Sequence, residues 1–155
     1  MTRILKTLAL PMVVLALGAC GSKTPTDPTA SNVTIKADPD PVTATTSTDP
    51  AYRWAATVNL TLTEDAGVGL TIGAVAGKIE AASGGIVVVQ ATPTVQRLQV
   101  RASGNRIASK GTLAVALDFL YTHPDAGRES LVTVTFTFFD DNGYSYTQSA
   151  QIKVV

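Results

Sequence analysis

Three long stretches of this chain alternate apolar and polar residues, which is the pattern of a β-strand with one buried and one solvated face. They are residues 52–64, 113–121 and 130–139. Trp54 lies in register with the apolar set of the first stretch, so we expect its ring in the core and a hydrogen-bond partner for its indole N–H. Past residue 31 no stretch has convincing helical periodicity, and the pattern therefore predicts an all-β fold.

Shorter segments at 32–37, 42–46, 70–81, 86–89 and 144–155 complete the predicted set of strands. The apolar residues of 70–81 change face at Gly73, where a β-bulge would reconcile the two sets. Residues 86–89 are four consecutive apolar side chains, and we expect a short strand buried on both faces or covering one end of the domain. Residues 94–111 are compatible with a strand or with one or two helical turns.

Seven or eight short strands separated by turn signals are typical of an antiparallel sandwich with Greek-key connections. At this level residues 32–155 resemble the immunoglobulin-like domains common on bacterial surface and periplasmic proteins. The resemblance implies an antiparallel immunoglobulin-like β-sandwich of about seven to eight strands. Two features depart from the antibody type: the chain has a single cysteine, and Trp54 falls on the second main strand rather than the third. A function taken from the fold would be analogy only.

The first 20 residues have the order of a secretory signal peptide: basic residues, then an apolar run, then small residues. The run ends in Leu17-Gly18-Ala19-Cys20, which resembles the lipobox of bacterial lipoproteins. The resemblance implies cleavage between Ala19 and Cys20 and acylation of the Cys20 thiol. The apolar run is shorter than the roughly 20 residues that a spanning helix needs, so we expect membrane attachment through lipid.

Residues 1–19 are therefore a predicted lipoprotein signal peptide, 20–31 a flexible tether and 32–155 a single folded domain. The tether contains no large apolar side chain and cannot bury enough surface to order itself. Gly21 stands where lipoproteins retained at the inner membrane carry aspartate, so the resemblance implies an outer-membrane address, with the domain facing the periplasm or the cell surface. The mature chain would carry ten basic and twelve acidic residues, a balance that does not favour nucleic acid.

Catalysis has little support in the sequence. His123, the single histidine, precedes Pro124 in a polar turn, where we expect it to be exposed. With one histidine and one cysteine, the latter assigned to lipid, neither a zinc site nor a cysteine nucleophile can be assembled. We expect a protein that is not an enzyme and has no cofactor.

Two acidic turns suggest a metal site. If the strands follow the usual sandwich order, the turns after 52–64 and 130–139 lie at the same end of the domain. Carboxylates brought together there repel unless they are solvated or bridged, and oxygen ligands of this kind suit calcium. The predicted ligands are Glu64, Asp65, Asp140, Asp141 and Asn142. The alternative is two ordinary solvated turns, in which Asp and Asn bond locally to the backbone.

The sequence thus predicts a lipid-anchored envelope protein that displays a non-enzymatic β-sandwich for binding or structural roles, with the membrane and another envelope protein or a glycan as partners. The alternative is a small-ligand or carbohydrate-binding module. Tyr121, Tyr144 and Tyr146 would then supply stacking faces, which requires exposed and coplanar rings.

Overall fold

The computed structural model describes residues 30–124 and 126–155. The predicted signal peptide, Cys20 and nearly all of the predicted tether lie outside this part. The described residues form strands and no helix. The strands are β1 (Val33–Ala37), β2 (Thr45–Thr46), β3 (Trp54–Glu64), β4 (Leu70–Ser83), β5 (Ile86–Val87), β6 (Val95–Ala102), β7 (Arg106–Ile107), β8 (Thr112–Thr122), β9 (Ser130–Asp140) and β10 (Ser145–Val154).

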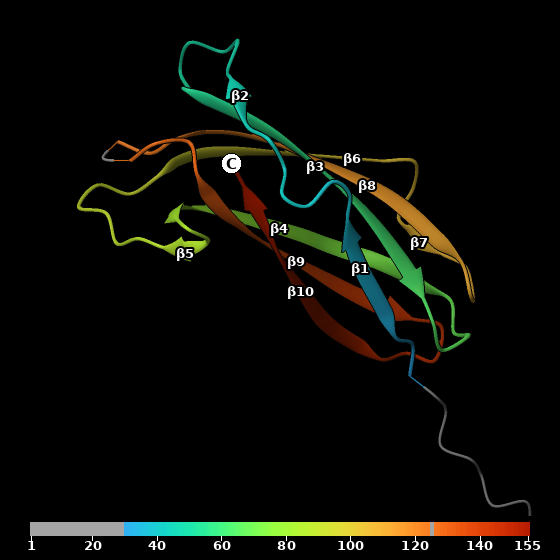
Figure 1. The fold of residues 1–155 in the computed structure, drawn as a ribbon. Coiled ribbons are helices and arrows are strands. Elements are labelled where there is room, and N and C mark those ends of the chain that lie inside the picture. Colours follow the sequence, from blue (N-terminus) through green and yellow to red (C-terminus); the bar gives the residue numbers. More distant parts are fainter. Residues whose placement is uncertain (1–29, 125) are drawn as a thin grey trace, which may run out of the picture.

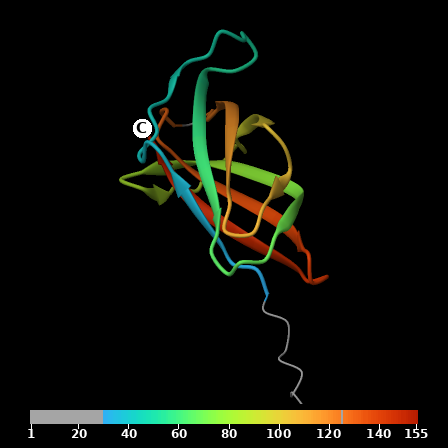
Figure 2. The same ribbon diagram turned by 90° about the vertical axis from the view of Figure 1, so that its right-hand side faces the viewer.

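The strands form two antiparallel sheets packed face to face (Figure 1). One has the order β1-β3-β8-β6 with β2 beside β3, and the other has β10-β9-β4 with β5 and β7 beside opposite ends of β4. Figure 2 shows the strands of the two layers crossing one another. Seven main strands in a four-on-three arrangement have the order of a constant-type immunoglobulin domain, which confirms the predicted fold class.

The core lies between the sheets and contains the alternate residues of the long strands. The apolar faces predicted for β3, β8 and β9 are buried, as the alternation requires. The largest side chains are aromatic, and the rings of Phe136 and Phe138 stack with centroids 5.8 Å apart. Trp54 packs against this core as predicted. The partner expected for its indole is not found, since Nε1 is buried without a hydrogen bond among the described residues.

The predicted bulge in β4 is confirmed. The register between β4 and β9 shifts between Ile72 and Ala74, at Gly73. A Cβ on Gly73 would lie 2.2 Å from Cε2 of Phe139, which covers this position from the outer face of β9. Glycine at the bulge therefore lets the ring of Phe139 lie against the backbone of β4.

The segment 94–111 is a strand, β6, followed by the two-residue β7, so its helical alternative is wrong. The inward faces of β6 and β8 cover the same core, and Leu98 of β6 packs against it. The predicted strand 42–46 is shorter than expected. Only Thr45–Thr46 pair with β3, while Val42 forms an isolated parallel bridge to Val154.

The sandwich has two ends that differ in chemistry (Figure 1). The chain enters β1 at the end where β3 and β9 finish, which we call the Glu64 end and define by residues 31–32, 64–69 and 140–144. The opposite end carries β5 and the loop that leads to β6, and we call residues 84–94 the β5 end.

Candidate functional site

The predicted calcium ligands lie at the Glu64 end, as the strand order requires. Glu64 is the last residue of β3 and Asp140 is the last of β9, so one comes from each sheet. Both carboxylates are buried. The entering chain links them, because Asn32 donates its N–H to Glu64 and the preceding Ser31 donates its N–H to Asp140.

Glu64 is satisfied by backbone donors. Its carboxylate accepts the N–H groups of Ala66 and Gly67, both at 2.8 Å, and of Lys110 at 3.0 Å. Burial by itself would raise the pKa of this carboxyl, but the N–H donors of Lys110, Gly67 and Ala66 outweigh burial and lower the pKa to about 2. Hydrogen bonds to the ionised form have this effect. Glu64 thus joins the turn after β3 to the turn before β8.

Asp140 has the same role on the other sheet. Its carboxylate accepts the N–H groups of Tyr144 at 2.8 Å, Asn142 at 3.0 Å and Ser31 at 3.1 Å. Burial by itself would raise the pKa of Asp140 too, but the hydrogen bonds from backbone N–H groups outweigh burial and lower the pKa. The β9–β10 turn is closed by its own first residue, and the positive φ of 88° at Gly143 is one that glycine adopts without strain.

The remaining predicted ligands have other partners. Asp141 forms a two-pronged ion pair with Arg106 at 2.7 and 3.0 Å, and Asp65 accepts the hydroxyl of Thr34 at 2.5 Å. Among the described residues no three His, Cys, Asp or Glu side chains are grouped so as to hold a metal ion. The structure brings the two turns to one end but does not converge their carboxylates, and calcium binding there stays a prediction.

His123 was expected to be exposed, and the structure shows that this is wrong. Its side chain is 1% exposed. Nδ1 lies 2.7 Å from the hydroxyl of Thr94, and Nε2 lies 2.8 Å from the hydroxyl of Ser130. Burial lowers the pKa of His123. Because Ser130 is equally buried and donates to the carbonyl of Arg128, this histidine–serine pair joins a loop to the core and is closed to solvent.

The three tyrosines do not form the stacking platform that carbohydrate binding requires. Tyr121 is fully buried and its hydroxyl donates to the carbonyl of Arg128 at 2.7 Å. Tyr146 is half-buried, with its hydroxyl 2.7 Å from that of Ser31. Only Tyr144 is exposed, at 43%. The rings therefore lie in different environments.

At the β5 end, the prediction that residues 86–89 are buried on both faces is wrong, because this apolar run is exposed; it lies at one end of the sandwich, as the other alternative expected. Only Ile86–Val87 pair with β4, and Val88 adds one bond to the carbonyl of Ala81 at 2.9 Å before the chain leaves the sheet. Ile86 is 73% exposed and Val89 is fully exposed. Four consecutive exposed apolar residues are uncommon on a globular domain unless something covers them.

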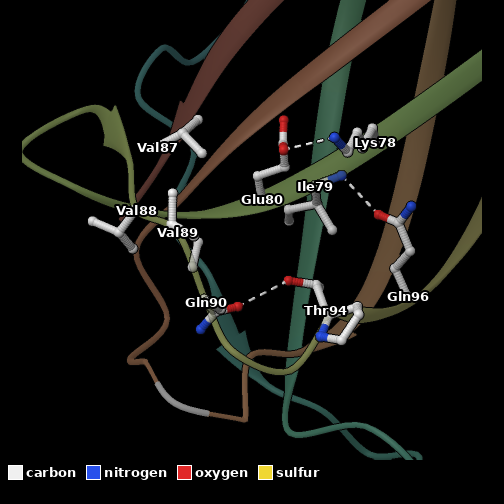
Figure 3. Close-up of a pocket in the computed structure, with 11 residues that line it drawn as sticks. Lys78, Ile79, Glu80, Val87, Val88, Val89, Gln90, Thr94 and Gln96 are labelled. Atoms are coloured by element: carbon white, nitrogen blue, oxygen red, sulfur yellow. Dashed lines mark hydrogen bonds and ion pairs between the residues drawn. The ribbon is translucent and has the colours of Figure 1, made fainter.

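A groove of about 350 Å³ lies where this run separates from β4 (Figure 3). Its floor is residues 78–81 of β4, and its walls are residues 87–90 and the start of β6. Lys78 and Glu80 pair with each other at 2.6 Å across its rim. Gln96 reaches from β6 to accept the backbone N–H of Ile79 at 2.7 Å.

One edge of β4 is free along most of its length. β7 pairs with Leu70–Thr71 and β5 pairs with Ala82–Ser83, and in the described chain no strand pairs with that edge between them. The groove lies at one end of this gap. Another groove of about 300 Å³, lined by residues 72–75 together with Val100 and Asn105, lies at the other end.

The residues that carry the predicted anchor, Ala19 and Cys20, lie outside the described residues. Within the described part, no helix is long and apolar enough to cross a membrane. The free edge of β4 was missed in the sequence because strand order cannot be read from it. The exposure of the run 86–89 was missed because four apolar residues in a row, between glycines and a proline, fit a buried strand equally well.

No family model matches the sequence, and no curated protein is similar to it. Among solved structures, the chain is similar to a GAE domain of GGA2p from Saccharomyces cerevisiae (8% identity, 81% of this chain, 90% of that one, TM-score 0.43). It is also similar to the yeast GGA1 GAE domain (11% identity, 83% and 95%, TM-score 0.45).

A third similar structure is the secreted serine protease VesC from Vibrio cholerae, with 15% identity and a TM-score of 0.43 over 64% of this chain. The match spans about a fifth of the protease, 19% of its length. At these identities and scores the three likenesses assign neither a family nor an activity.

Proposed function

We propose that this protein is a lipid-anchored component of a bacterial cell envelope, held by an acylated Cys20 at the outer membrane, and that its β-sandwich binds a partner without catalysing a reaction. The observation that carries the anchor is Leu17-Gly18-Ala19-Cys20 at the end of a basic-then-apolar segment. One acyl chain holds a protein only marginally and a second makes attachment stable, so the proposal requires at least two chains on the mature N-terminus.

The two ends of the sandwich support a binding role. The chain reaches β1 at the Glu64 end, so an anchor before residue 30 attaches there and the β5 end lies opposite (Figure 1). The carboxylates of the Glu64 end are occupied by backbone donors, whereas the β5 end exposes Ile86 and Val89 beside a groove. An apolar surface opposite the anchor is suited to a partner in the envelope.

The anchor is tested by replacing Cys20 with serine in the bacterium. We expect the wild-type protein to be recovered with membranes and to carry a diacylglyceryl and acyl mass on its first residue. Cys20→Ser should remain uncleaved or unmodified and should not incorporate labelled palmitate. Membrane-bound wild-type protein without lipid mass on Cys20 would overturn the proposal. Gly21→Ser, which leaves the cysteine in place, is the matched control and should behave as wild type.

Carbohydrate binding, the second function expected from the sequence, is not favoured by a specific observation. It required three exposed coplanar tyrosines, and Tyr121 lies in the core while Tyr146 is half-buried. The β5 end offers branched aliphatic side chains, which pack against other aliphatic groups rather than stacking on sugar rings.

A further inference from the structure

We propose that the free edge of β4, from Gly73 to Glu80, together with the exposed run 86–89, is a docking site for an extended, uncharged and apolar segment of a partner protein, which binds as an added strand beside β4. The proposal rests on the binding role proposed above and is independent of the lipid anchor. Strand addition to an exposed edge uses main-chain hydrogen bonds for affinity and side-chain pockets for specificity.

The backbone of β4 defines the shape of the occupant. β5 and β7 pair with β4 at its two ends, and the edge between them has no partner strand in the described chain. Since Ile79 turns its N–H toward this edge, the alternation of an antiparallel ladder turns the N–H groups of Gly77 and Val75 the same way. A row of N–H groups at this spacing can be hydrogen-bonded by the carbonyls of another strand. That strand would lie beside β4 next to β5.

Gln96 marks where a carbonyl of that strand would lie. Its side-chain oxygen lies 2.7 Å from the N–H of Ile79, in the position that a partner carbonyl would take.

The walls of the groove define the side chains of the occupant. Val87, Val88, Val89 and Pro93 line it, and its two ionisable residues, Lys78 and Glu80, neutralise each other. The groove therefore offers contact to small aliphatic groups and no free charge to a charged one. A bilayer is the other occupant that exposed valines fit, but a bilayer supplies no carbonyls in register with β4 and leaves the free edge unexplained.

The first test selects peptides on the full-length protein in detergent from a displayed library of random dodecapeptides. We expect enriched sequences with aliphatic residues at every second position. One of them, resynthesised with N-methyl groups on alternate residues, should lose at least ten-fold in affinity when the methyl groups lie on the edge that faces β4. It should keep its affinity when they lie on the other edge. No enrichment, or equal tolerance on both edges, would overturn the proposal.

The second test changes Gln96, whose side-chain oxygen takes the place of a partner carbonyl on the N–H of Ile79. Gln96→Ala frees the N–H of Ile79 and should bind the enriched peptide several-fold more tightly. Gln96→Glu puts a stronger acceptor on the same N–H and should bind it more weakly. Gln99→Ala on the same strand is the matched control, because Gln99 is exposed and lines neither groove. Equal affinities for the three variants would refute the role of the edge.

The third test separates the strand from the bilayer and from the anchor. A protein made from residue 21 onward, which contains every described strand and lacks both the apolar run and the lipid, should bind the enriched peptide as wild type does and should not bind vesicles of phosphatidylethanolamine and phosphatidylglycerol. Vesicle binding that is lost in Val89→Thr would assign the run 86–89 to the bilayer and overturn the proposal. Failure of lipidation with peptide binding intact would remove the anchor alone.

Discussion

The two ends of this sandwich differ in whether the backbone groups that the strands leave unpaired find partners. At the Glu64 end, polar groups that the strands leave without partners are bound by two carboxylates, one from each sheet. At the β5 end, the edge of β4 from Gly73 to Glu80 has no partner strand in the described chain and lies beside exposed aliphatic side chains. The difference fits our proposal that one end stabilises the domain and the other binds a partner.

The largest expected effect is the loss of the Glu64 charge. A pKa lowered from 4.5 to about 2 corresponds to about 3 kcal/mol of stability at neutral pH. Glu64→Gln should therefore lower the free energy of unfolding by about 2–3 kcal/mol, measured by urea denaturation at pH 7. Glu80→Gln removes a surface ion pair and should cost at most about 1 kcal/mol. Equal losses in the two variants would contradict the contrast between buried and exposed carboxylates.

Acid should weaken the Glu64 end in a defined range of pH. Because the folded pKa of Glu64 lies below its ordinary 4.5, the fold favours the charged form, and its contribution is complete above about pH 4.5. The contribution is lost as the pH falls toward 2. Asp140, whose pKa is also lowered, adds to the loss in the same direction. Urea midpoints between pH 6 and 2.5 should fall less steeply for Glu64→Gln than for wild type.

A smaller effect should come from His123, which is hydrogen-bonded to Thr94 of the β5 end. Burial lowers its pKa below the ordinary 6.5, so the folded protein holds the neutral ring while the unfolded chain takes up a proton. The stability that follows is complete above about pH 6.5 and decreases as the pH falls below it. Proton NMR of the ring should show that His123 titrates at a lower pH than a histidine in the unfolded chain. A ring that titrates at 6.5 or above would contradict the burial of His123.

The smallest expected effect on stability is at Val89. Val89→Thr keeps the branched shape and changes a fully exposed methyl to a hydroxyl. The free energy of unfolding should therefore change by less than about 0.5 kcal/mol. The same variant should weaken the peptide selected on the groove. Loss of stability without loss of peptide binding would reverse the roles assigned to the two ends.

The sequence predicts the layers of this domain better than its ends. Alternation in β3, β8 and β9 predicts which side chains enter the core, and the phase change at Gly73 predicts the bulge. The run 86–89 has no alternation, and four apolar residues in a row do not tell a buried strand from an exposed one.

The errors at single residues have a common cause, which is contact between distant parts of the chain. His123 is buried through Thr94, 29 residues before it, and Ser130, and no local pattern records those contacts. The acidic residues at the turns were placed at the correct end. Donors from their own turns, such as Gly67 for Glu64 and Tyr144 for Asp140, agree with the alternative of local backbone bonding. The N–H of Lys110 was not visible because it comes from another turn.

The entry of the chain into the domain has a mechanical consequence. The N–H of Ser31 is held by Asp140 and that of Asn32 by Glu64, so two consecutive residues are fastened to different sheets. Beyond them β1 runs antiparallel to β3 for its whole length. Tension applied to the chain before Ser31 would be shared between the two layers and would load the β1 ladder in shear, so that the first strand resists being peeled away from its neighbour.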